Sequence, residues 1–326
     1  MIVVFDFGMS FAHRIFGFVL IAVSLADGLR ALPTTGVPEF PDSLVLQAVV
    51  DRAAAATLEQ FKSRSLTREQ LAITLVDLRD PSRPERASYR GDVLIYPASV
   101  IKLCYLAAAH RWMEDGRMTD TPELRRALRD MIVDSSNDAT HYVIDLLSGT
   151  TSGPELSATE IAAWFDRREV VTRYFAGLGY TGVIANKKPW GDGPYGRESQ
   201  AIKAFEPKRN MLTTDDTARL FSEIATGRCV TPARSGEMLA LLARDPATGD
   251  PDPDNQAKFM GPGLPPGTKL WSKAGWTSKT RHDAALIELP DGARYVLVIY
   301  TTDHAQERTI IHTAAKAVVA GLRNVR

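Results

Sequence analysis

The feature that most constrains the fold of this chain is the division of its strand-like segments into two groups by a long helical stretch. The first group holds a β-branched segment at residues 71–77 and a short segment at 87–90. The second group holds segments at 269–275, 283–289 and 294–301, and the turn sequence Leu289-Pro290-Asp291-Gly292 joins the last two. Because strands need neighbours in a sheet, we expect both groups to form one antiparallel sheet.

Apolar residues recur at helical spacing between and beside the two groups. The expected helices cover residues 43–62, 99–115, 122–133, 138–147, 158–178, 214–225, 232–243 and 306–322. Gly- and Pro-rich stretches at 179–210 and 245–266 are predicted to be loops. The sequence thus predicts an α+β fold, with an antiparallel sheet from both chain ends flanked by helices. Residues 32–96 and 265–326 would form the sheet domain, and 97–264 an inserted all-helical domain.

The first 31 residues resemble a signal peptide. Arg14 precedes an apolar run at 15–26, which has the length of an export signal and is too short to cross a bilayer comfortably. We therefore expect a secreted protein, or one in the periplasm or cell envelope. An uncleaved anchor or a buried helix remains the alternative. No other segment is apolar enough to predict a stable membrane span.

Charge and cysteine content narrow the possible partners. The 39 basic residues balance the 39 acidic ones, so no net field favours nucleic acid. Cys104 and Cys229 form no C-x-x-C pair, and no H-x-H or H-E-x-x-H pattern occurs, so we expect no metal site. A disulfide between the two cysteines stays open, as does the oligomeric state. We expect a small-molecule or peptide substrate and no cofactor.

A serine and a lysine stand three positions apart where a helix is expected to begin. Ser99 follows Pro97 by two positions and precedes Lys102 by three. Such positions share a helix face, with Cβ atoms roughly 5–6 Å apart. A serine hydroxyl needs a base to become a good nucleophile, and a lysine can serve where burial lowers its pKa. We expect this chemistry here, although an N-cap serine beside a surface lysine would give the same pattern.

Two further segments supply groups that such a nucleophile needs. Ser135 and Asn137 lie at a predicted helix start and offer a proton-relaying hydroxyl and an amide that can bind a carbonyl. Lys273 lies within a predicted strand, and Gly275 two residues later would let a ligand approach that strand closely. Alone, each segment also fits a structural role, a helix cap or a lysine that protects a sheet edge.

In order and context, the segments S-V-I-K, S-S-N and K-A-G resemble the S-x-x-K, S-D-N and K-T-G elements of serine β-lactamases and penicillin-binding proteins. The resemblance covers about residues 43–322 and is strongest to class A β-lactamase-like serine hydrolases. It implies an α/β sandwich of the β-lactamase/transpeptidase type and hydrolysis of β-lactams or related amides and esters through an acyl-enzyme.

The resemblance also implies a role for each site residue. Ser99 would be acylated with Lys102 as its base, Ser135 would protonate the leaving nitrogen, and Asn137 would orient Lys102 and the substrate amide. Lys273 would bind the substrate carboxylate. Substrate-binding positions would include Gly275, Trp276 and Arg281. The N–H of Trp276 would complete an oxyanion hole with that of Ser99. Arg281 would bind a substrate carboxylate, and the alternative is a plain surface arginine.

The sequence departs from the family pattern at three places. Ser136 replaces the aspartate of S-D-N, and Ala274 replaces the threonine of K-T-G. The E-x-x-L-N pattern that supplies the deacylating glutamate in class A enzymes is missing, and Glu198 is the candidate for that base.

These departures leave several functions open. The alternatives are a D-Ala-D-Ala carboxypeptidase, transpeptidase or esterase of the same fold, a glutaminase of related fold, and a non-catalytic penicillin-binding-like receptor.

Overall fold

The structure, a computed structural model, describes residues 40–323, so the signal-like segment 1–31 lies outside the described residues. Its centre is a six-stranded antiparallel sheet in the order β2-β1-β8-β7-β6-β5. The five longer strands are β1 (Leu71–Asp77), β2 (Glu85–Tyr89), β6 (Lys269–Trp276), β7 (Thr280–Glu288) and β8 (Arg294–Thr302). Since β1 pairs with β8, the two strand groups meet in one sheet, which confirms the predicted fold class.

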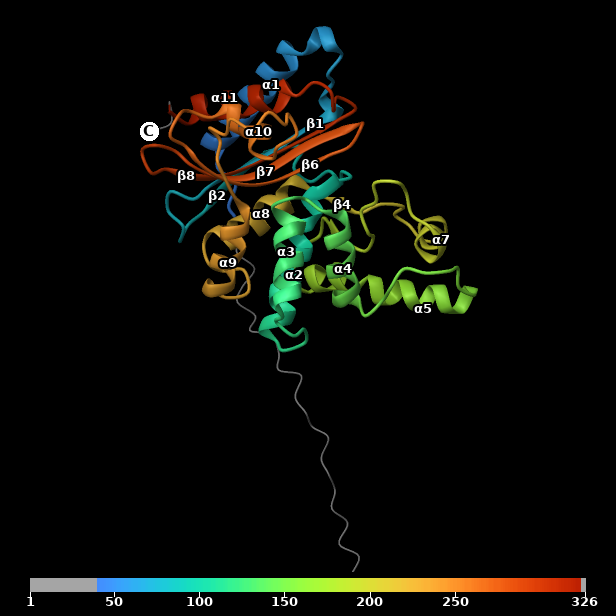
Figure 1. Ribbon diagram of the computed structural model, residues 1–326. Helices are drawn as coiled ribbons and strands as arrows, with labels where there is room; N and C mark the ends of the chain where they lie inside the picture. Colours follow the sequence, from blue (N-terminus) through green and yellow to red (C-terminus); the bar gives the residue numbers. More distant parts are fainter. Residues whose placement is uncertain (1–39, 324–326) are drawn as a thin grey trace, which may run out of the picture. The chain divides into compact units, whose positions relative to one another are not determined.

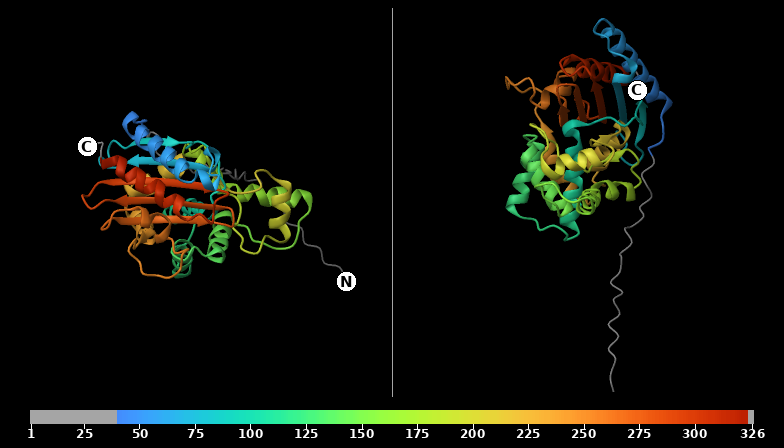
Figure 2. Two further views of the ribbon diagram at one scale, coloured as in Figure 1. Left: turned by 90° about the horizontal axis from the view of Figure 1, so that it is seen from above. Right: turned by 90° about the vertical axis from the view of Figure 1, so that its right-hand side faces the viewer.

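Helices cover both faces of this sheet. On one face lie α1 (Leu44–Gln60) and α11 (Thr309–Arg323), which cross the strands in Figure 2 (left). The opposite face packs on α8 (Thr214–Ala225) and on the segment that begins α2 (Lys102–Glu114). Because both faces are covered, every residue of β1 is buried and the strand presents no solvent face.

Six of the remaining helices lie beyond that second face (Figure 1). They are α3 (Pro122–Ile132), α4 (Asn137–Ser148), α5 (Ala158–Arg168), α6 (Val170–Gly177), α7 (Gly196–Ala204) and α9 (Pro232–Leu242). The short helix α10 (Ala257–Met260) lies instead beside α11 on the first face. Two short strands, β3 (Val183–Ile184) and β4 (Met211–Leu212), pair with each other. The described residues belong to one compact unit, and their division into a sheet domain and an inserted domain stays a prediction.

Several predicted boundaries were wrong. The helix expected at 158–178 divides at Glu169, whose carboxylate accepts a hydrogen bond from Asn186 Nδ2 at 2.5 Å. The loop expected at 179–210 contains α7 and β3. The loop expected at 245–266 contains α10, and residues just before it belong to the sheet as β5 (Ala243–Arg244).

Two local features near the expected nucleophile also differ from the prediction. The helix expected at 99–115 begins with a 3₁₀ turn at Ala98–Ile101, and α2 proper starts only at Lys102. Cys104 and Cys229 are both buried free thiols, so the possible disulfide is not formed.

Among residues 40–323, none of the helices combines the length and the apolar character that crossing a bilayer requires.

Candidate active site

Ser99 lies on the 3₁₀ turn that leads into α2, directly against strand β6. The preceding residue, Ala98, has a φ of 47°, an uncommon conformation for a residue with a side chain. A Cβ added to Gly275 of β6 would lie 2.8 Å from the backbone nitrogen of Ser99 and 2.7 Å from the carbonyl oxygen of Pro97. The glycine therefore allows the strand to contact the backbone at the half-buried serine. The expected close approach of a ligand at this position stays a prediction.

His282, which pairs with Gly275 in the neighbouring strand β7, supports the same turn. Its Nδ1 accepts a hydrogen bond from the Thr301 N–H at 3.1 Å, so Nε2 carries the proton and donates to the Tyr96 carbonyl at 3.0 Å. Burial lowers the pKa of His282 to about 4, which keeps the ring neutral. The sequence offered no signal for this role, because the contact joins positions far apart in the chain.

Lys102 is completely buried at the start of α2. Its Nζ donates to the Ser135 carbonyl at 2.5 Å, to Asn137 Oδ1 at 2.9 Å and to Ser135 Oγ at 3.3 Å. Burial lowers the pKa of Lys102 to about 7, so a large fraction of its amines are neutral at physiological pH. This is the state that a lysine base needs.

Ser135 joins the two lysines. It has a φ of 55° in the turn between α3 and α4, and this backbone conformation is strained for a serine. Lys273 Nζ donates to Ser135 Oγ at 3.0 Å from the side of β6. The hydroxyl therefore lies between two amines, Lys102 and Lys273, which belong to segments more than 170 residues apart in the chain.

Lys273 has an environment that strongly disfavours its charge. It is completely buried, and burial together with the positive charges of Lys102 and Arg244 lowers its pKa well below the usual value. Asp283 on β7 lies close enough to oppose this effect, and its own pKa is raised by burial to about 8. Neither oxygen of Asp283 accepts a hydrogen bond, so no such contact stabilises the ionised carboxylate against the effect of burial.

Gln256 is a site residue that sequence reasoning missed. Its Oε1 accepts from Lys273 Nζ at 2.7 Å and from the Ala274 N–H at 3.1 Å. It lies in the stretch expected to be a solvent-exposed loop, whose Pro, Gly and Asp content conceals the buried glutamine.

Trp276 and Arg281, two predicted substrate-binding residues, contact other side chains, Phe259 and Asp254. The Trp276 ring packs on Phe259, with ring centroids 5.4 Å apart. Arg281 pairs with Trp276 across the strands, its guanidinium lies 3.6 Å from the centroid of the Phe259 ring, and its Nη1 donates to Asp254 at 2.9 Å. A substrate carboxylate that used this arginine would compete with Asp254.

Glu198 lies in a buried ion cluster apart from these groups. Its carboxylate accepts from Arg168 Nη2 at 2.6 Å and from Ser152 Oγ at 2.8 Å, and Lys188 Nζ lies 3.6 Å away. Asp145 provides the second carboxylate of the cluster, 2.8 Å from Lys188 Nζ. All of these contacts of Glu198 involve its Oε1, and none of them links the carboxylate to Ser99 or Lys102.

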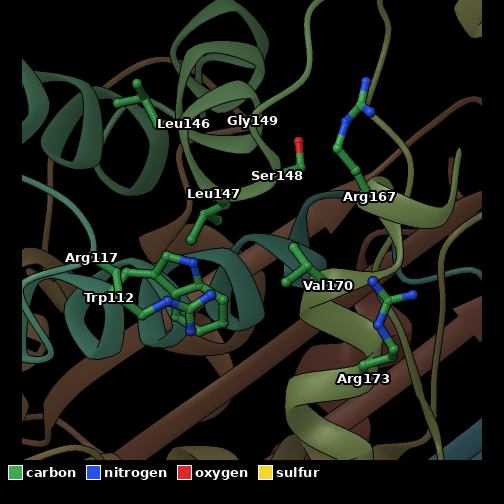
Figure 3. A pocket seen from close by; sticks show the side chains of 9 residues that line it. All are labelled: Trp112, Arg117, Leu146, Leu147, Ser148, Gly149, Arg167, Val170 and Arg173. Atoms are coloured by element: carbon green, nitrogen blue, oxygen red, sulfur yellow. The ribbon is translucent and has the colours of Figure 1, made fainter. Parts of the chain in front are cut away.

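A pocket of about 330 Å³ in the helical part of the molecule contains none of the residues described above. Figure 3 shows Arg117 over the ring of Trp112, with Arg167 and Arg173 on the opposite side. Arg167 belongs to the last turn of α5, where a positive side chain complements the carbonyl end of the helix. Arg173 pairs with Asp166 at 3.0 Å. Within residues 40–323, no three metal-binding side chains gather in one place.

The fold is shared by solved structures of serine β-lactamases and a penicillin-binding protein. The model of the Beta-lactamase enzyme family matches residues 57–322, and the chain belongs to this family. It is a β-lactamase-like serine hydrolase by family membership.

Solved structures share the fold at low identity. The acyl-enzyme complex of a PBP-A mutant with penicillin G is 20% identical with a TM-score of 0.60, and the match covers 87% of this chain and 99% of that one. A β-lactamase from Sphaerobacter thermophilus DSM 20745 is 20% identical with a TM-score of 0.58, covering 84% and 97%. A variant of the last common ancestor of Gram-negative bacteria class A β-lactamase is 20% identical with a TM-score of 0.60, covering 86% and 100%. No curated protein matches the sequence.

Proposed function

We propose that the protein hydrolyses β-lactams or related amides and esters through an acyl-enzyme on Ser99, and that it works outside the cytoplasm. The observation that carries this proposal is the position of Ser135 Oγ between Lys102 Nζ and Lys273 Nζ, at 3.3 and 3.0 Å. A helix cap or an edge-strand lysine would not need this arrangement, whereas proton transfer between an attacking and a leaving group does.

The reaction begins with the neutral amine of Lys102, which takes the proton of Ser99 Oγ as that oxygen attacks the substrate carbonyl carbon. The negative charge that develops on the carbonyl oxygen is stabilised by the N–H groups of Ser99 and Trp276. Ser135 then gives its proton to the leaving nitrogen as the C–N bond breaks, and the protonated Lys102 restores that proton. Asn137 holds Lys102 and the substrate amide.

Lys273 serves this sequence in two ways. Its amine donates to Ser135 Oγ and stabilises the oxygen while the proton is absent. A substrate carboxylate beside Lys273 would favour the charged form of this lysine, and that charge would bind the carboxylate that β-lactams and D-Ala-D-Ala peptides share. Arg281 would add to this attraction only after Asp254 releases it.

The second candidate function is that of a D-Ala-D-Ala peptidase or esterase whose acyl-enzyme persists with penicillins. The ion pairs of Glu198 favour it, because a glutamate held by Arg168 and Lys188 is poorly placed to activate the deacylating water. A non-catalytic receptor of the same fold would have no use for the buried lysine with a pKa of about 7.

Intact-mass spectrometry over time, with a penicillin, a cephalosporin and a chromogenic thioester, separates these possibilities. We expect an adduct on the wild-type protein and none on Ser99→Ala. An adduct that disappears with release of product identifies a hydrolase for that probe, and one that persists identifies the peptidase-like alternative. If a folded wild-type protein forms no adduct with any probe, acyl-enzyme chemistry is excluded and the receptor alternative remains.

A further inference from the structure

Gln256 makes four hydrogen bonds that connect the two halves of the candidate site. Its Oε1 accepts from Lys273 Nζ at 2.7 Å and from the Ala274 N–H at 3.1 Å, both on strand β6. Its Nε2 donates to the carbonyls of Ile132 at 2.9 Å and Val133 at 2.8 Å, at the end of α3. The side chain thus spans the space between Lys273 and the turn that carries Ser135.

The contact with Lys273 fixes the direction of that amine. Lys273 Nζ lies within hydrogen-bond distance of Ser135 Oγ at 3.0 Å, Gln256 Oε1 at 2.7 Å and the Ala274 carbonyl at 2.8 Å. Since the contacts with Gln256 and Ala274 hold the nitrogen in place, its remaining position is directed at Ser135. Loss of Oε1 would leave one buried donor unsatisfied and the amine free to rotate.

The contacts at the other end fix the Ser135 turn. Ile132 and Val133 end α3, and Ser135 follows in a strained conformation with a φ of 55°. Strained backbone persists only where surrounding contacts hold it. The Ile132 carbonyl also accepts from Arg244 Nη2 at 3.0 Å, so this helix end is held from the side of β5 and β6 by two side chains.

We propose that Gln256 is a positioning residue for the proton transfer to the leaving group, because its amide fixes Lys273 and the Ser135 turn relative to each other. This inference rests on the proposed acyl transfer at Ser99. Glutamine suits the role because one amide offers an acceptor to the lysine and donors to two carbonyls. A glutamate would turn a second oxygen toward those carbonyls, and a leucine would remove all four bonds.

The test compares two substrates whose leaving groups differ in whether they must be protonated. The nitrogen of a β-lactam must be protonated as it leaves, whereas a thiolate leaves a thioester without a proton. We expect Gln256→Leu to lower the second-order acylation rate with a penicillin by about ten- to a hundredfold, which is less than the roughly 10²–10⁴-fold that a proton-transfer group itself contributes, because Gln256 acts through Ser135 and Lys273. The rate with a chromogenic thioester should fall less than threefold.

The matched control is Gln200→Leu. Gln200 also bridges backbone groups, with Oε1 accepting from the Leu156 N–H at 2.9 Å and Nε2 donating to the Leu156 carbonyl at 2.7 Å, but it lies on α7. Gln200→Leu should leave both acylation rates unchanged, apart from any loss that a lowered melting temperature accounts for. Gln256→Glu keeps the size of the side chain and one acceptor, and it replaces Gln256→Leu in the test if that variant does not fold. It should also lower the acylation rate with penicillin more than the rate with the thioester.

Equal losses with both probes, or no loss with penicillin, would overturn the positioning role, since a general structural defect affects both leaving groups alike. If the wild type reacts with neither probe, the proposed function fails separately from this inference. The contact is then tested without substrate by NMR of lysine side chains labelled with ¹³C at Cε. Gln256→Leu should shift the Lys273 signal while Gln200→Leu leaves it in place, and an unmoved signal would overturn the inference.

Discussion

Gly275 presents its α-carbon to the backbone of Ser99 so closely that a Cβ on the glycine would lie 2.8 Å from the Ser99 nitrogen. Real Cβ atoms essentially never come this near to another heavy atom. Strand β6 and the turn at Ser99 can therefore contact each other only while position 275 has no side chain.

We expect Gly275→Ala to separate these two backbones and to lower the acylation rate on the order of a hundredfold, because misplacement by about 1 Å has that effect on oriented reactions. Stopped-flow acylation with a fluorescent penicillin measures the change. The control is Gly236→Ala on α9, where an added Cβ meets nothing within 4 Å. Full activity of Gly275→Ala would show that the close approach is not needed.

Lys102 predicts the pH dependence of acylation. Its pKa is lowered to about 7 by burial, and only the neutral amine can take the proton of Ser99. The acylation rate should rise as the pH increases through about 7 and level off above it. Lys102→Arg should lose this rise together with about 10²–10⁴ of the rate, since arginine stays charged. Lys269→Arg, on the exposed part of β6, should keep the wild-type profile.

Asp283 predicts a pH dependence of stability. Burial raises the pKa of its carboxyl group from 3.8 to about 8, so the folded state holds one more proton than the unfolded state between these values. This contribution makes the protein less stable as the pH rises from about 4 to 8. Urea unfolding at pH 5 and pH 8 measures the difference.

The variant Asp283→Asn should remove that contribution. As the pH rises from 5 to 8, the free energy of unfolding of the variant should therefore increase by about 1–3 kcal/mol relative to that of the wild type. Because the charge of Asp283 also raises the pKa of Lys273, the comparison reports the coupled titration of these two groups. Asp92→Asn, at an exposed position, is the control. A parallel response of the wild type and Asp283→Asn would mean that Asp283 does not titrate in this range.

We expect the replacement of Glu198 to lower the stability of the protein without changing its deacylation rate. In Glu198→Gln the positive charges of Arg168 and Lys188 would keep only Asp145 as a counter-charge. Since breaking a buried ion pair is strongly destabilising, the free energy of unfolding should fall by about 3 kcal/mol. The lifetime of a penicillin adduct should stay unchanged. Glu206→Gln, which affects an exposed acid, should change neither quantity. A longer adduct lifetime in Glu198→Gln at unchanged stability would identify Glu198 as the base.

The sequence alone determined the fold class, because the spacing of apolar residues and the turn residues are local signals of helices and strands. The strand expected at 71–77 and the helix expected at 214–225 have those bounds in the structure. The sequence also supplied the candidate residues Ser99, Lys102 and Lys273, since their spacing within short segments follows from helix and strand geometry.

Only the tertiary structure decided which groups meet. Gln256 and His282 act on residues far along the chain, and no local pattern distinguishes them from an ordinary loop glutamine or a core histidine. The same holds for Glu198, whose partner Arg168 comes from α5, and for Arg281, whose partner is Asp254. Burial sets the lowered pKa of Lys102 and the raised pKa of Asp283, and burial depends on how the whole chain packs.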